Sequence, residues 1–115
     1  MSWNINFEED NMLPPIRNKP VLLKKSVIAK NMNSHPDVPL DGYKEIIMAA
    51  LYNPQEILKG HATKPYYNFI AHVKQDKNAI VLAQTENTSS GYVEIVNLHW
   101  IRDKSVEQKR KNKQS

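Results

Sequence analysis

The sequence predicts an α+β fold: two N-terminal helices packed on a three- to four-stranded antiparallel sheet, followed by a short basic C-terminal helix or tail. The spacing of the apolar residues carries this prediction. It is helical before Asn53-Pro54, and it alternates residue by residue afterwards. Because a sheet with one apolar face must bury that face, the two helices are expected to cover it. A small β-barrel with an appended helical hairpin is the alternative architecture.

Two helices are expected in residues 21–53. The first runs from Val21 to about Asn33, and its apolar residues lie near one face: Leu22, Leu23, Val27, Ile28 and Met32. The second begins near Asp41, a suitable N-cap, and ends at Asn53-Pro54. It has the clearest amphipathic pattern of the chain, with apolar residues at i, i+3, i+4, i+7 and i+8: Tyr43, Ile46, Ile47, Ala50 and Leu51.

The second half of the chain is typical of an antiparallel meander. A short strand is expected over residues 55–59, and longer strands over 66–73, 79–84 and 92–101. Alternation places Tyr67, Phe69, Ala71 and Val73 on one face, with Asn68, Ile70 and His72 on the other. The last strand is expected to present Tyr92, Glu94, Val96, Leu98 and Trp100 on one face, and Val93, Ile95, Asn97, His99 and Ile101 on the other.

The two ends differ from this body. Residues 1–20 contain three prolines and show neither periodicity, so an irregular N-terminal arm is expected there. A single domain is expected over residues 21–103, with a basic tail over 104–115. Residues 102–115 hold six basic and two acidic side chains, and therefore carry the whole net charge of +4. Such a tail attracts phosphate backbones, or it serves only as a solvated, solubilising segment.

The composition excludes several classes of function. The chain of 115 residues has no cysteine, which excludes disulfides and thiol chemistry, and its three glycines form no phosphate loop. The four histidines show no metal-ligand spacing, so no metal and no cofactor is expected. Neither a secretory signal nor an apolar run of the roughly 20 residues that span a bilayer is present, so a cytoplasmic protein without membrane contact is expected.

Histidines are therefore the main candidates for chemistry. His72 and His99 lie in expected strands, Arg102 follows His99, and His35 lies at the junction of the two helices. Two histidines and an arginine suffice for metal-free RNA cleavage: one removes the 2′-hydroxyl proton, the other protonates the leaving oxygen, and the cation stabilises the phosphorane. Each histidine also fits a purely structural role.

Aromatic and basic residues before the second strand add a candidate binding surface. Lys64 and Tyr67 are candidates for holding substrate, because an aromatic ring stacks on bases and a lysine attracts phosphate. Aromatic residues at alternating strand positions are also typical of a core.

The stretch HPDVPLDGYKEIIMAALYNPQEIL, followed by FIAHV, AIVLAQT and GYVEIVNLHWIRD, resembles small phage-associated nuclease-like domains of the barnase–EndoU–colicin–RelE-like superfamily. The resemblance covers roughly residues 21–105. It implies a metal-independent ribonuclease or toxin-like module, with His35 as the helix-junction histidine and with His99, Arg102 and Ser105 completing the site. Many members keep a Ser or Thr before an aromatic in the last strand, and Asn97-Leu98-His99-Trp100 departs from that pattern.

Three functions are compatible with the sequence. The first is RNA cleavage, with His35, His99 and Arg102 as catalytic residues. Its substrate contacts would come from Lys64, Tyr67, His72 and Ser105. The second is a non-catalytic module that binds nucleic acid or an acidic protein through the basic tail. The third is an assembly domain of a phage or mobile element that contacts a cognate protein or a second copy of itself.

Overall fold

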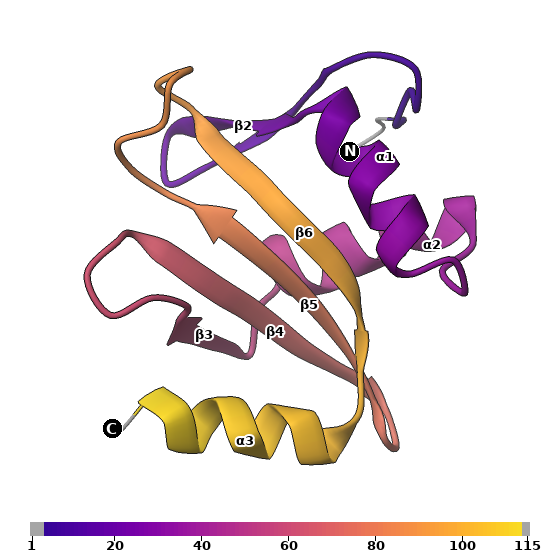
Figure 1. The fold of residues 1–115 in the computed structure, drawn as a ribbon, viewed down its shortest axis with the longest axis vertical. Coiled ribbons are helices and arrows are strands. Elements are labelled where there is room, and N and C mark those ends of the chain that lie inside the picture. Colours follow the sequence, from indigo (N-terminus) through magenta and orange to yellow (C-terminus); the bar gives the residue numbers. More distant parts are fainter. Residues whose placement is uncertain (1–3, 114–115) are drawn as a thin grey trace.

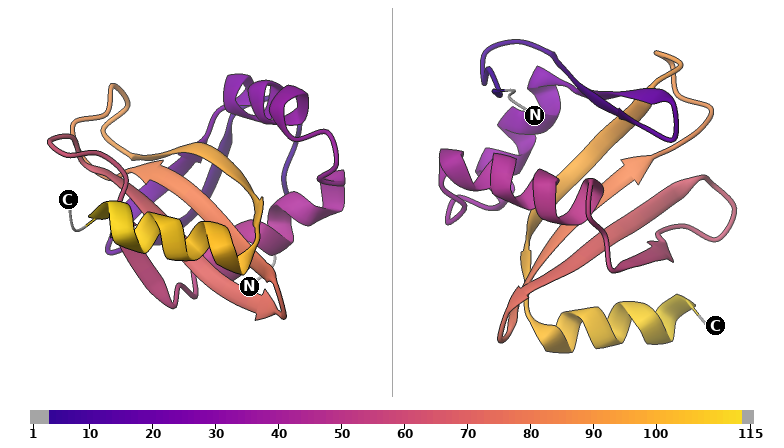
Figure 2. Two further views of the ribbon diagram at one scale, coloured as in Figure 1. Left: turned by 60° about the horizontal axis from the view of Figure 1, so that its bottom comes forward. Right: turned by 180° about the vertical axis from the view of Figure 1, so that it is seen from behind.

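One mixed sheet of six strands organises the molecule, in the order β1-β2-β6-β5-β4-β3. The computed structural model describes residues 4–113, and the side chains of residues 4–111. Helices α1 and α2 lie on one side of the sheet, and α3 crosses the other (Figures 1 and 2). The elements in chain order are β1 (Asn11–Ile16), β2 (Lys19–Leu23), α1 (Lys25–Ser34), α2 (Leu40–Ile46), η1 (Ile47–Leu51), β3 (Glu56–Lys59), β4 (Tyr66–Lys74), β5 (Lys77–Gln84), β6 (Val93–Ile101) and α3 (Asp103–Lys113).

The expected sheet of three to four antiparallel strands is wrong, because two further strands come from the region assigned to an irregular arm and a helix start. A two-residue turn at Arg17-Asn18 joins β1 to β2, and both residues have left-handed backbones, with φ of 49° and 66°. β2 then pairs in parallel with β6, which makes the sheet mixed. The prolines of β1 obscured it in the sequence, although an edge strand tolerates them.

The first helix begins four residues later than expected, at Lys25. Val21, Leu22 and Leu23 are buried as part of β2 and do not form a helical face. The buried residues of α1 are Ile28 and Asn31, whereas Met32 is 41% exposed. Because Asn31 is polar, the spacing of apolar residues could not predict that it is buried.

The predicted apolar face of the second helix is confirmed. All five of its residues are at most 2% exposed, although α2 ends at Ile46 and the chain continues as the π-helical segment η1. These side chains pack on the main core, which also contains Phe69, Val81, Ile95 and Leu98 from the central strands. Strands β3 to β6 form the expected antiparallel meander.

A bulge in β6 breaks the expected alternation of its side chains. Leu82 pairs with Asn97, but the next residue of β5, Ala83, pairs with Ile95, so Val96 is the extra residue. As a result Leu98 shares the main core with Val93 and Ile95. His99 lies opposite Ile80, a residue of the second apolar cluster, and therefore points to the other face.

Of the two alternatives expected for the C-terminal end, a helix or a tail, the structure shows a packed helix, α3. α3 buries Val106 against Leu58, Ile70 and Ile80, which form a second, smaller apolar cluster on the face opposite the main core. This face was not expected to carry a helix of eleven residues. No helix in the described part of the chain is long and apolar enough to cross a membrane.

Candidate functional site: a stacked histidine pair

Asn31 fixes α1 against the edge of β6. β2 pairs with the start of β6, at Val93 and Glu94, and farther along the strand the side chain of Asn31 takes the place of a neighbouring strand. Its Nδ2 donates to the carbonyl oxygen of Leu98 at 2.6 Å, and its Oδ1 accepts from the N–H of Leu98 at 2.9 Å. Because Asn31 is only 2% exposed, these two bonds are shielded from water.

This anchor brings two of the predicted catalytic residues together. His35 is the C-cap of α1, and its N–H donates to the carbonyl oxygen of Asn31 at 2.8 Å. Its ring stacks on that of His99 with a centroid separation of 4.1 Å and an interplanar angle of 10°. The rings of His35 and His99 are therefore in contact, which a shared catalytic site requires, and their catalytic roles stay predictions.

The environment of His99 favours the neutral imidazole. Burial lowers the pKa of His99 to about 4, with further lowering by the neighbouring charges of His35 and Lys109; Asp37 opposes this shift. The Nδ1 atom of His99 is buried and has no hydrogen-bond partner among the described residues. At neutral pH His99 is thus an uncharged ring, and its lowered pKa makes it a weaker proton acceptor than an ordinary histidine.

The other predicted residues lie elsewhere. Arg102 is exposed and pairs with Asp76 of the β4–β5 turn, with Nε 2.7 Å from the carboxylate. Lys64 lies in the exposed loop before β4, and Ser105 lies in the first turn of α3. Tyr67 packs, half-buried, against the main core.

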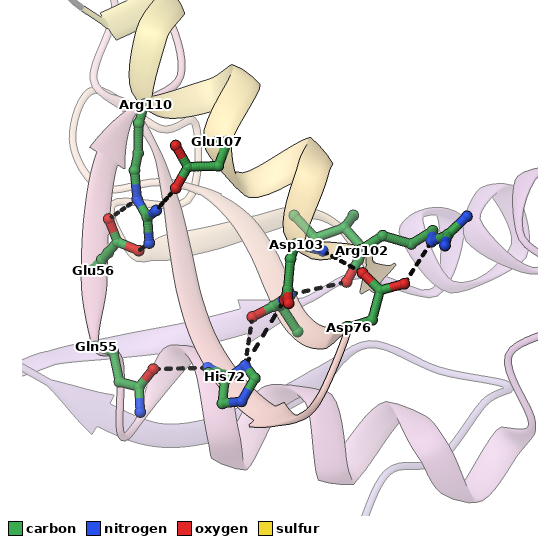
Figure 3. A network of polar contacts seen from close by, with 10 residues as sticks. Gln55, Glu56, His72, Asp76, Arg102, Asp103, Glu107 and Arg110 are labelled. Atoms are coloured by element: carbon green, nitrogen blue, oxygen red, sulfur yellow. Dashed lines mark hydrogen bonds and ion pairs between the residues drawn. The ribbon is translucent and has the colours of Figure 1, made fainter.

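His72 belongs to a polar network that holds α3 on the sheet (Figure 3). Its Nδ1 lies 3.2 Å from Oδ1 of Asn78, and Asn78 in turn donates from Nδ2 to Asp103 at 2.8 Å. Farther along α3, Arg110 pairs with Glu56 and Glu107.

Carboxylates dominate the groove beneath α3. The groove has a volume of about 360 Å³, and its lining includes Glu56, Asp103 and Glu107 together with His72 and Arg110. Three carboxylates disfavour a phosphate there. The network is therefore better suited to fixing α3 than to holding RNA. His72 takes part in this network and not in the stacked pair.

Three residues near the stacked pair were not among the predicted site residues: Asn31, Asp37 and Lys109. Asp37 belongs to the Ser34-His35-Pro36-Asp37 segment, so its sequence position alone gave a signal. Asn31 and Lys109 gave none. The role of Asn31 depends on the position of α1 beside β6, and the closeness of Lys109 to His99 depends on the packing of α3 across the sheet.

The depressed pKa of His99 predicts acid sensitivity. In the unfolded chain the pKa of His99 has its ordinary value of 6.5, whereas in the folded protein it is about 4. Above pH 6.5 the protonation of His99 therefore does not affect the free energy of unfolding. As the pH falls from 6.5 to about 4, this free energy decreases, because the unfolded chain binds the proton first. Because His99 is partly exposed, we expect wild type to lose about 1–2 kcal/mol more than His99→Gln between pH 7 and pH 4. Urea unfolding at both pH values measures the difference, and equal losses would contradict it.

Comparison with known proteins assigns the class of the chain. The fold is an α+β domain whose described elements run from β1 to α3, with the histidine pair at one edge of its central strand. The family model of large polyvalent protein-associated domain 13 matches residues 6–113. The chain belongs to this family, which agrees with the phage-associated part of the resemblance, whereas the nuclease part stays a prediction. The match begins before β1, so β1 is part of the family domain. Neither the curated proteins nor the solved structures yielded a match.

Proposed function

We propose that this domain cleaves RNA without a metal ion at the stacked pair His35–His99. The observation that carries the proposal is the pair itself: two imidazoles from distant parts of the chain, held face to face by the Asn31 anchor. Parallel stacked rings present their edges side by side, so one phosphodiester group can contact both. Imidazole is the side chain best suited to moving protons near neutral pH.

The proposed reaction is an internal transfer at phosphorus. His99, neutral at pH 7, accepts the proton of a 2′-hydroxyl as its oxygen forms a bond to the adjacent phosphorus. The bond from phosphorus to the 5′ oxygen breaks, and that oxygen takes a proton from His35. The products are a 2′,3′-cyclic phosphate and a free 5′-hydroxyl. His99 then releases its proton to solvent and His35 takes one up, so both rings return to their starting states.

Lys109 replaces Arg102 as the cation of the proposed site. Arg102 is neutralised by Asp76, whereas Lys109 acts on the pKa of His99 through its charge. An ammonium group near the pair would stabilise the extra negative charge of the phosphorane. A bound phosphate would also raise the pKa of His99 toward the range of an effective base, because its negative charge opposes the effects of burial and of Lys109.

The direct test is cleavage of a 5′-labelled RNA by the wild-type protein in EDTA. We expect products that end in a 2′,3′-cyclic phosphate. An otherwise identical strand with one 2′-deoxynucleotide should resist cleavage at that position, because it lacks the attacking hydroxyl. Intact RNA after prolonged incubation at high enzyme concentration would overturn the proposal.

A further inference from the structure

A second groove lies between the β1–β2 turn and strand β4, away from the histidine pair. Two adjoining cavities, of about 130 and 230 Å³, share the lining residues Arg17, Phe69, Thr85 and Glu86. Phe69 belongs to the main core, whereas His99 points to the opposite face of the sheet. The β1–β2 turn and the loop between β3 and β4 lie at the same end of the sheet (Figures 1 and 2).

The floor of this groove is apolar and partly aromatic. Phe69 is 4% exposed, and Tyr67 and Ile57 are half-buried beside it. Ile16 and Val93 extend the apolar lining on the other side of Phe69. A floor of this kind receives a planar ring by stacking and by apolar contact.

The rim of the groove carries positive charge in an unusual place. Arg17 has a φ of 49°, in the left-handed region, although this turn position favours Asn, Asp or Gly. Among the side chains that the structure describes, its guanidinium has no hydrogen-bond or ion-pair partner, so it is available to a ligand. Lys19 lines the same groove and donates from Nζ to the carbonyl oxygen of Thr85 at 3.1 Å.

We infer that this groove binds a nucleotide, with the base against Tyr67 and Phe69 and the phosphate on Arg17. An arginine recognises phosphate with two parallel hydrogen bonds, and an aromatic ring stacks on any base. The two cations of the rim, Arg17 and Lys19, outnumber its one carboxylate, Glu86. Each cavity is smaller than a usual ligand pocket of about 300–1,000 Å³, and only the two together reach the size that suits a single nucleotide, either free or as one unit of a strand. This inference does not depend on catalysis by the histidine pair.

Fluorescence anisotropy tests it with a labelled 2′-O-methyl RNA pentamer, which resists attack by a 2′-hydroxyl, and with AMP as a second probe. Arg17→Gly removes the charge, and glycine accepts the left-handed backbone more readily, so this variant should fold at least as well as wild type. We expect its Kd for the pentamer to rise at least tenfold, and Tyr67→Leu to raise it about tenfold. Lys30→Ala removes an exposed charge from α1 and should stay within twofold of wild type.

The outcomes are distinct. Displacement of the pentamer by AMP, but not by inorganic phosphate, identifies a site for free nucleotides, and displacement only by unlabelled RNA identifies a strand site. The 2′-O-methyl pentamer cannot be cleaved by 2′-hydroxyl attack, so its Kd reports this groove independently of catalysis, and a failure of cleavage and a failure of this site can be told apart. Equal affinity of wild type and Arg17→Gly, or no binding of either probe by wild type, would overturn the inference.

Discussion

Replacement of His99 by glutamine should lower the rate of metal-free RNA cleavage by about 10²–10⁴-fold, the range in which a positioned acid–base group acts. Glutamine has a polar side chain of comparable length but takes up no proton in this pH range, so the proton of the 2′-hydroxyl loses its acceptor. His35→Gln should have a loss of similar size, because it removes the proton donor for the leaving oxygen. Single-turnover cleavage of the labelled RNA in EDTA measures both rates.

Non-additivity provides the sharper form of this test. If the two rings act on one phosphodiester, the double variant should be scarcely slower than either single one, since each loss already disables the site. His61→Gln is the matched control, because His61 lies in the exposed loop before β4. A rate for His99→Gln within threefold of wild type, or an equal loss in His61→Gln, would contradict the assignment.

Replacement of Asn31 by alanine should lower the free energy of unfolding by about 2–4 kcal/mol. The change removes both hydrogen bonds to Leu98 and leaves the N–H and the carbonyl of that residue without partners at a fully buried position. An unpaired buried polar group costs more than the hydrogen bond itself contributes, and here two are created at once. Urea unfolding followed by circular dichroism gives the difference.

Asn33 offers a matched control on the same helix. It has the same side chain but is exposed, so Asn33→Ala should change the stability by no more than about 0.5 kcal/mol. Because Asn31 also positions the end of α1 that carries His35, its replacement should disturb the stacked pair, which the ring-proton NMR signals of the two histidines report. Equal stability losses in Asn31→Ala and Asn33→Ala would contradict the role of Asn31 as an anchor.

The errors of the sequence interpretation have two physical origins. The first is local: β1 contains Pro14 and Pro15, which removed it from consideration as a strand, and β2 is an apolar run too short to be distinguished from a helix start. The second is the bulge at Val96, which exchanges the faces of all later residues in β6. A strand register depends on the partner strand, so this exchange has no signature in the strand itself.

The sequence predicts the two histidines of the candidate site but not the residues around them. Histidine performs acid–base chemistry, so the sequence predicts His35 and His99 as site residues, and the structure brings their rings to 4.1 Å. Arg102 follows His99 closely in the sequence, which predicts that it joins the site, but its ion pair with Asp76 directs it to the β4–β5 turn. Closeness in sequence does not determine the direction of a side chain at the end of a strand.

By itself the sequence determined the amphipathic helix of residues 43–51, the meander of residues 55–101 and the residue types available for chemistry, because these depend on periodicity and composition. Only the tertiary structure decided that the N-terminal hairpin completes a mixed sheet and that Asn31 substitutes for a strand beside β6. It also decided that Arg110 pairs with Glu56, whereas the charge of Lys109 acts on the pKa of His99. Such features depend on pairs of residues far apart in the chain, such as Val21 with Val93 and Asn31 with Leu98, and no local pattern encodes them.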